Sequence, residues 1–307
     1  MFDSAPFPNR QVDRKSCPLH NPSNVLKLEI RERENKEDHM NTARILQGKH
    51  AVIFGAGGSI GAAVAAEFSA QGAEVFLSGR TKSSVEAVAK KITAEGGLAH
   101  AAAIDTLDED AVNQYIDGIV NQTAKVDIVL DAAGPLAREY GNGKNAIQLP
   151  IEEFMVPLTT MVKSRFITAR AAARHMIKQH SGVIIFVTGS PARPHVPGAA
   201  AIGTAFGAIE NLTGNLAFEV SPSGVRVVCI RTVANTDSRS IQDTMDFLAG
   251  QLKITKDQAM AQIAQSNFLK VPATVQDTAN AAVLVASDHA RMMTGTVVNA
   301  TAGAALD

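Results

Sequence analysis

The 307-residue chain has no tryptophan, two tyrosines and two cysteines. Cys17 lies in a polar segment and Cys229 inside the apolar run VRVVCI, so neither a disulfide framework nor a cysteine metal cluster is available. We therefore expect no metal site and a reducing, cytoplasmic location. The scarcity of tyrosine leaves Tyr115 and Tyr140 as the only phenolic proton donors.

A strong charge bias and a long apolar run are also missing. The formal net charge is −1 at pH 7, which gives no electrostatic reason to expect nucleic acid or an anionic membrane as a partner. No apolar run approaches the roughly 18 residues of a spanning helix, and the first residues have no signal-peptide core. With 46% hydrophobic and 19% charged residues, the chain has apolar material for one large core or two modest ones.

Residues 1–45 differ from the rest of the chain. They contain several prolines and the mixed-charge run LKLEIRERENKEDH, which has little apolar periodicity. This composition predicts a disordered or loosely ordered extension. Met40 precedes a natural opening for a compact domain, so residues 1–39 are also candidates for a start-site artefact.

Residues 46–307 read as one α/β domain, because short apolar segments alternate with helical patterns. This alternation predicts a Rossmann-type, doubly wound parallel sheet of about seven strands, buried on both faces by helices. A helical insertion around residues 237–266 is placed where a lid over a substrate would lie. The expected strands are Ala51–Phe54, Glu74–Ser78, Leu98–Ala103, Val126–Leu130, Val183–Thr188, Val225–Arg231 and Gly295–Val298, and the expected helices include Lys82–Glu95, Leu107–Gln122, Ile151–Gln179, Gly198–Val220 and Thr274–Ser287.

The segment VIFGAGGSIG joins the first of these strands to a helix through a glycine-rich turn. Gly55 lets the chain leave the strand sharply, Gly57 and Gly58 leave room for phosphate oxygens, and Gly61 lets the helix approach the sheet. The helix N-terminus adds positive potential. The turn therefore predicts a dinucleotide site.

With these residues in place, the chain resembles the short-chain dehydrogenase/reductase family from about His50 to the C-terminus. Gly55, Ser59 and Gly61 match the family's Gly-x3-Gly-x-Gly spacing, with a serine that can cap the helix in place of the middle glycine. Asp105-Thr106 resembles the adenine-contacting segment, and Asp131-Ala-Ala-Gly resembles the Asn-Asn-Ala-Gly turn. The resemblance and the turn together predict the cofactor contacts Gly55, Gly57, Gly58, Ser59, Ile60, Gly61, Arg80, Thr81, Asp105, Thr106, Ala132, Ala133 and Gly134.

The end of the second strand indicates which dinucleotide is preferred. An NAD-binding protein places a carboxylate there for the ribose 2′-OH. This chain has Ser78-Gly-Arg-Thr-Lys82, with no carboxylate and with two cations. Since a guanidinium suits a phosphate, we expect NADP(H) rather than NAD(H). The alternative is a helix-cap loop with solvated basic side chains.

The catalytic positions depart from the family. Members that transfer hydride use a Tyr-x3-Lys pair, a serine after the fifth strand and an asparagine on the preceding helix. The corresponding positions here are Ile202, Phe206, Gly189 and Met161. A register error cannot restore the pair, because no Tyr or Lys lies between positions 181 and 220.

Ile202 and Phe206 belong to an apolar helical stripe, which is either core, subunit interface or the wall of a pocket beside the nicotinamide. The predicted substrate pocket consists of Gly189, Ser190, His195, Ile202 and Phe206. Ser190, His195 and Tyr140 are weak candidates for a proton donor. A loop histidine is more often solvated, and Tyr140 is expected at the surface.

Two functions remain open at this point. The first is an NADP(H)-dependent oxidoreductase with a non-standard proton donor and a small-molecule substrate. The second is a non-catalytic NADP(H)-binding protein that senses the cofactor or supports a partner. The resemblance also implies a homodimer or homotetramer built on the helices Ile151–Gln179 and Gly198–Val220.

Overall fold

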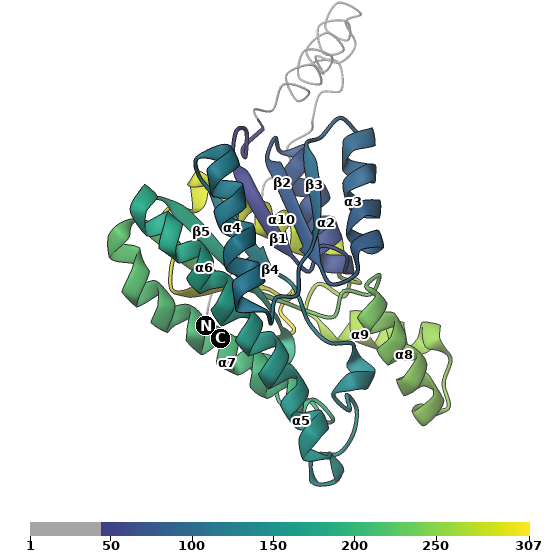
Figure 1. Cartoon of the computed structure of the whole chain (residues 1–307). Helices are drawn as coiled ribbons and strands as arrows, with labels where there is room; N and C mark the ends of the chain where they lie inside the picture. Colours follow the sequence, from purple (N-terminus) through teal and green to yellow (C-terminus); the bar gives the residue numbers. More distant parts are fainter. Residues whose placement is uncertain (1–43) are drawn as a thin grey trace, which may run out of the picture. The chain divides into compact units, whose positions relative to one another are not determined.

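A computed structural model describes residues 44–307, except for the side chains at positions 247, 248, 251 and 252. The predicted extension up to Ala43 lies outside the described residues. The described part forms the predicted parallel sheet of seven strands, in the order β3-β2-β1-β4-β5-β6-β7 (Figure 1). The strands are β1 (His50–Phe54), β2 (Glu74–Gly79), β3 (Ala99–Ala103), β4 (Ile128–Asp131), β5 (Gly182–Gly189), β6 (Val225–Thr232) and β7 (Thr296–Ala300).

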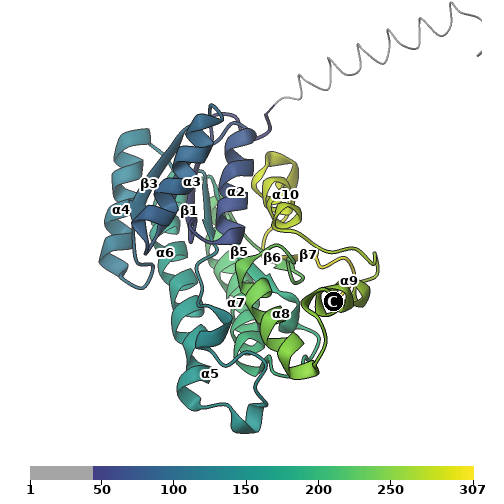
Figure 2. The same cartoon turned by 90° about the vertical axis from the view of Figure 1, so that its right-hand side faces the viewer.

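Helices cover both faces of the sheet, as expected for a doubly wound fold (Figures 1 and 2). One face carries α2 (Ser59–Ala70), α3 (Lys82–Ala94) and α10 (Val275–Ala286) around a core that includes Phe68 and Ile53. The other face carries α4 (Glu109–Thr123), α6 (Lys163–Gln179) and α7 (Ala200–Val220) around Phe54 and Phe186. The strand order reverses between β1 and β4, where a doubly wound sheet opens a crevice for a ligand.

The expectation that every strand is buried on both faces is wrong for the two edge strands. The central strands β4 and β6 are almost wholly buried, whereas β3 and β7 consist mainly of half-buried and exposed residues. An edge strand has a neighbouring strand on one side only, and the small side chains of β3 leave its surface open.

The predicted continuous helix Ile151–Gln179 is interrupted. It consists of α5 (Ile151–Pro157), a π-helical segment (Leu158–Val162) and α6. Pro157 lacks the N–H that a regular helix would use, so the helical hydrogen bonds have to be rearranged near this point. The irregular segment carries Met161, the residue at the family's asparagine position.

Residues 239–266 form two helices, α8 (Arg239–Leu252) and α9 (Lys256–Ser266). They share a small apolar cluster of their own, in which Met245, Ala249 and Ala259 are buried. The hydroxyls of Ser238 and Thr255 cap the two helices by accepting hydrogen bonds from backbone N–H groups of their first turns. The segment predicted as a lid is therefore a folded helical pair.

Across residues 44–307, none of the helices combines the length and the apolar character that crossing a bilayer requires.

Candidate active site

The glycine turn after β1 is packed too closely for side chains. Gly55 has φ +77°, and a Cβ there would lie 2.5 Å from the backbone nitrogen of Ala133. A Cβ on Gly61 would collide with the carbonyl oxygen of Gly55. These two positions need glycine for close backbone approach. Gly57 and Gly58 line a pocket, and a Cβ there would lie 3.0 Å from Cβ of Ser84 and 3.3 Å from the Gly55 carbonyl oxygen, respectively.

The predicted capping role of Ser59 is wrong. Gly58 is the N-cap of α2, and no side chain caps this helix. The Ser59 hydroxyl instead accepts a hydrogen bond from the backbone N–H of Arg239, at 3.1 Å. Ser59 lies in the first turn of α2, directly after the glycine turn. The bond therefore connects the start of α8 to this end of α2.

A pocket of about 310 Å³ lies at the carboxyl ends of the first four strands. It is lined by most of the predicted cofactor contacts: Gly55, Gly57, Gly58, Arg80, Thr81, Asp105, Thr106, Ala132, Ala133 and Gly134. Ser59, Ile60 and Gly61 are not part of its lining. Ser84, Thr160 and Arg239 also line it and were not predicted from the sequence.

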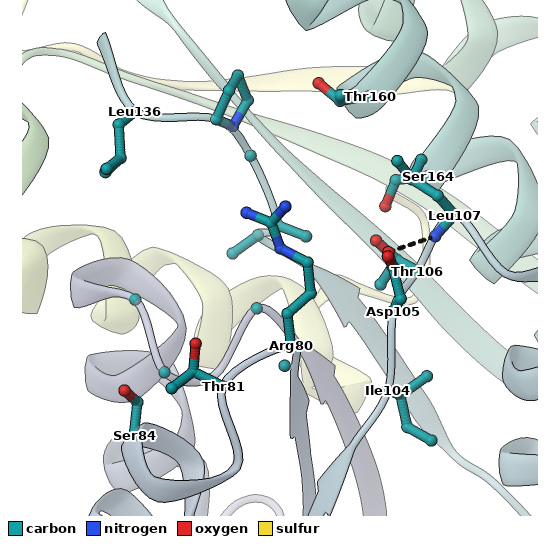
Figure 3. A pocket seen from close by; sticks show the side chains of 18 of the residues that line it. Arg80, Thr81, Ser84, Ile104, Asp105, Thr106, Leu107, Leu136, Thr160 and Ser164 are labelled. Atoms are coloured by element: carbon teal, nitrogen blue, oxygen red, sulfur yellow. Dashed lines mark hydrogen bonds between the residues drawn. The ribbon is translucent and has the colours of Figure 1, made fainter. Parts of the chain in front are cut away.

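Arg80 extends from the end of β2 into the middle of this pocket (Figure 3). In the view of Figure 3, Thr81 and Ser84 lie on one side of it, and Asp105 and Thr106 on the other. The Asp105 carboxylate is held by the backbone N–H of Leu107, at 3.0 Å. Arg80 is exposed and makes no salt bridge within the described residues, so its guanidinium is free to meet an anion.

A second cavity, of about 540 Å³, adjoins the first and shares Ala132 with it. Successive residues of α6 and the preceding π segment face the two spaces, since Thr160 and Ser164 line the dinucleotide pocket while Met161 and Arg165 line the cavity. Most of the remaining wall is apolar and includes Ile60, Ile202, Phe206, Val233, Ile241 and Met245. The volume and the lining are typical of a small-molecule site.

Phe206 fills the space beside Gly189, the position predicted for the family's serine after β5. A Cβ on Gly189 would lie 2.8 Å from Cε2 of the Phe206 ring. The ring therefore occupies the space that a serine side chain at position 189 would need. Ile202 and Phe206 both contact the apolar core and line the cavity, so two of the three alternatives considered for this stripe, core and pocket wall, are compatible.

The three candidate proton donors are placed differently. Ser190 lines the cavity, as the sequence predicts. His195 does not: its side chain is exposed and lines an adjoining hollow, which shares Pro191, Pro194 and Val196 with the cavity. Tyr140, expected at the surface, is only 7% exposed and lines the cavity.

The burial of Tyr140 has a structural cause. It ends a short 3-10 turn (Ala137–Glu139), and it packs against the same core as Met161 and Ile202. The loop that carries it is tied to α8 by a hydrogen bond from Asn142 Nδ2 to the Thr244 hydroxyl, at 3.4 Å. Desolvation by burial raises the pKa of Tyr140 to about 12, so its phenol stays protonated at neutral pH.

Beneath the cavity lies a buried polar group around Asp131, at the end of β4. Its carboxylate accepts hydrogen bonds from the Ala133 N–H at 2.8 Å, the Ser164 hydroxyl at 2.5 Å and the Thr168 hydroxyl at 3.1 Å. Arg165 Nη1 donates to the Ala133 carbonyl and lies 3.8 Å from Asp131 Oδ1. Sequence reasoning missed Arg165, although a cation four residues after Met161 on a buried helix face was a visible signal.

Known proteins are similar to this chain in sequence and in fold. A family profile described as short chain dehydrogenase matches residues 49–246. The 7alpha-hydroxysteroid dehydrogenase of Escherichia coli strain K12 is 28% identical over 258 residues, which cover 84% of this chain and 94% of that protein.

Two solved structures are similar at 26% identity. One is 3-ketoacyl-(acyl-carrier-protein) reductase from Brucella melitensis complexed with NADH, with TM-score 0.73, covering 85% of this chain and 100% of that one. The other, from Beutenbergia cavernae, is assigned as an NAD(P)-dependent gluconate 5-dehydrogenase with bound NADP at low occupancy; its TM-score is 0.74, and the match covers 85% of this chain and 98% of that one.

Proposed function

This chain belongs to the short-chain dehydrogenase family, and from that premise we propose that it is an NADP(H)-dependent oxidoreductase that reduces a carbonyl group on a small, largely apolar molecule. The observation that carries the proposal is that the two spaces adjoin each other. The dinucleotide pocket and the apolar cavity share Ala132, so a ring at the end of the first would face a substrate in the second.

The residues of the first pocket fit a nicotinamide dinucleotide. Gly57 and Gly58 line the pocket at the start of α2, where the absence of side chains leaves room for a pyrophosphate. Two structures similar to this chain contain such cofactors, one NADH and one NADP. When bound, this cofactor supplies the hydride, and all other steps rest on side chains of the protein.

Arg80 supports a preference for NADP(H). Its guanidinium lies at the end of β2, where a carboxylate would contact the ribose 2′-OH of NAD, and it can hold a 2′-phosphate through two hydrogen bonds. Arg239 lines the same pocket from the start of α8 and adds a second cation.

Tyr140 is the proton donor we propose. Among the described residues that line the cavity, Tyr140 and Arg165 are the only ones with titratable side chains. A phenol with a pKa of about 12 remains protonated at neutral pH and can transfer its proton to the oxygen that receives charge during reduction. The neighbouring Ser190 hydroxyl can orient that oxygen by hydrogen bonding.

The experiment has two separate readouts. Calorimetry with NADPH and NADH measures cofactor binding, and the oxidation of NADPH is then followed with a panel of apolar aldehydes, ketones and quinones, each with and without a carboxylate. We expect NADPH to bind more tightly than NADH and at least one carbonyl class to be reduced. Binding without turnover across the panel would contradict the oxidoreductase proposal and favour the non-catalytic alternative.

We also propose that two copies pair through α6 and α7. Phe166 on α6 is 47% exposed and Phe218 on α7 is 87% exposed, which is costly for apolar side chains in water. Gly207 and Gly214 on α7 have open space around the Cβ position, which permits close approach of a neighbour. Sedimentation velocity at micromolar concentration tests the pairing, and a stable monomer would contradict it.

A further inference from the structure

Arg165 places a positive charge in the wall of the substrate cavity. Its side chain is 1% exposed, and it is the only charged residue among those in the described chain that line this cavity. Phe206 holds the position predicted for the family's lysine on α7, so the positive charge in the cavity wall comes from α6 instead. Burying a guanidinium costs free energy unless its N–H groups are paired.

The guanidinium is incompletely paired. Nη1 donates to the Ala133 carbonyl, whereas the buried Nε has no hydrogen-bond partner among the described residues. Asp131 does not fill this gap, because its closest distance to Arg165 is 3.8 Å, too long for a hydrogen bond. The Asp131 carboxylate is already held by three other donors, from Ala133, Ser164 and Thr168.

The second fully buried arginine, Arg231 on β6, shows what complete pairing looks like. Its Nε donates to Glu210 Oε1 at 2.7 Å and its Nη2 to Glu210 Oε2 at 2.9 Å, while Nη1 donates to Asp307. The hydrogen bonds that Arg231 donates to Glu210 raise the pKa of Arg231. Arg231 does not line the cavity. The arginine in the cavity wall is thus the one that retains an unused donor.

We propose that Arg165 recognises a carboxylate on the substrate, so that the enzyme acts on monocarboxylates with an apolar body. This inference rests on the proposed function for the location of the substrate. A carboxylate can accept from a guanidinium through two parallel hydrogen bonds, which a neutral carbonyl or hydroxyl cannot match. The cavity offers no second cation among its lining residues, so a single negative charge suits it better than a phosphate or a dicarboxylate.

Binding of an inert pair of probes tests the proposal without turnover. The protein saturated with NADPH is titrated calorimetrically with 3-phenylpropanoate and with 3-phenylpropan-1-ol, which differ in the carboxylate. We expect the carboxylate to bind at least about tenfold more tightly, the equivalent of about 1.4 kcal/mol. Arg165→Met should abolish this difference. Arg193→Met is the matched control, because Arg193 is an exposed cation on the adjoining loop that does not line the cavity.

A second measurement covers the case in which Arg165→Met does not fold. In ¹⁵N spectra of the unsubstituted protein, the Nε–H signal of Arg165 should shift on adding 3-phenylpropanoate and not on adding the alcohol. The Nε–H of Arg231, bonded to Glu210, should stay in place. Equal affinity for the two probes, or an Arg165 signal that ignores the carboxylate, would overturn the proposal.

A failure of the proposed function can be distinguished from a failure of carboxylate recognition by Arg165. If calorimetry shows no NADPH binding, the oxidoreductase proposal is wrong, and the same titrations of the free protein still decide whether Arg165 recognises a carboxylate.

Discussion

The carboxyl ends of β1–β4 and of β5–β6 lie side by side, yet they relate to the sequence in different ways. The first region depends on backbone geometry: Gly55 and Gly61 allow close approach, and the pocket matches most predicted contacts. The second depends on side chains, and there the positions that the sequence predicts for the family's serine, tyrosine and lysine hold Gly189, Ile202 and Phe206, which line the cavity. We therefore expect cofactor binding and proton transfer to respond separately to substitutions in the two regions.

The replacement in the second region is concerted. Gly189 makes room for the Phe206 ring, and the cation and the phenol that line the cavity come from α6 and from the loop after β4. A single substitution that restores a side chain at position 189 would therefore clash with the Phe206 ring. We expect the largest experimental differences at Tyr140 and the smallest in the pH profile.

Tyr140→Phe should lower the rate of carbonyl reduction by about 10² to 10⁴-fold, because the ring still fills its place and the transferable proton is lost. Tyr115→Phe is the matched control: its hydroxyl donates to the Leu77 carbonyl at 3.3 Å, and it does not line the cavity. Single-turnover kinetics with saturating NADPH measures both. A rate unchanged by Tyr140→Phe would assign the proton to another donor, such as Ser190 or water.

Arg80→Ala tests the other region. Charge-assisted hydrogen bonds contribute about 1.5 to 3 kcal/mol, so the preference for NADPH over NADH should shrink by about 10 to 150-fold. Lys82→Ala should change it much less, since Lys82 lies 3.6 Å from Glu86 on the exposed side of α3. Calorimetry with both cofactors gives the ratio. Equal affinities in the unsubstituted protein would contradict the NADP(H) assignment.

The two regions also explain what could be predicted from the sequence. A glycine turn between a strand and a helix has a local signature, so the dinucleotide pocket followed from Gly55 to Gly61 and from Arg80. The sheet followed from the apolar periodicity. Burial of Tyr140 depends on packing between a loop, α6 and α7, which no local pattern encodes. The bond from the Arg239 N–H to Ser59 joins residues far apart in the chain, so no local pattern predicts it. The position of Arg165 in the cavity wall likewise depends on the tertiary structure.

Gly189→Ala tests the concerted replacement through stability. The added Cβ would lie 2.8 Å from the Phe206 ring, and overpacking of this kind costs about 1 to 3 kcal/mol. Gly118→Ala is the control, because nothing lies within 4 Å of its Cβ position and an exposed helical glycine replaced by alanine stabilises by about 0.5 to 1 kcal/mol. Urea denaturation measures both. Two variants of equal stability would show that the ring moves aside freely.

The pH profile of carbonyl reduction should be nearly flat from about pH 7 to about pH 10. Burial raises the pKa of Tyr140 to about 12 from an ordinary value near 10, so the phenol keeps its proton throughout that range. Because of the same shift, the folded state holds the Tyr140 proton more strongly than the unfolded state does. The contribution of this proton to the free energy of unfolding is therefore fully present below pH 10 and is lost as the pH rises toward 12. Initial rates at saturating NADPH, with the enzyme's folding followed by circular dichroism, separate the two effects. A rate that falls with a midpoint well below pH 10 in the folded enzyme would mean that a different group supplies the proton.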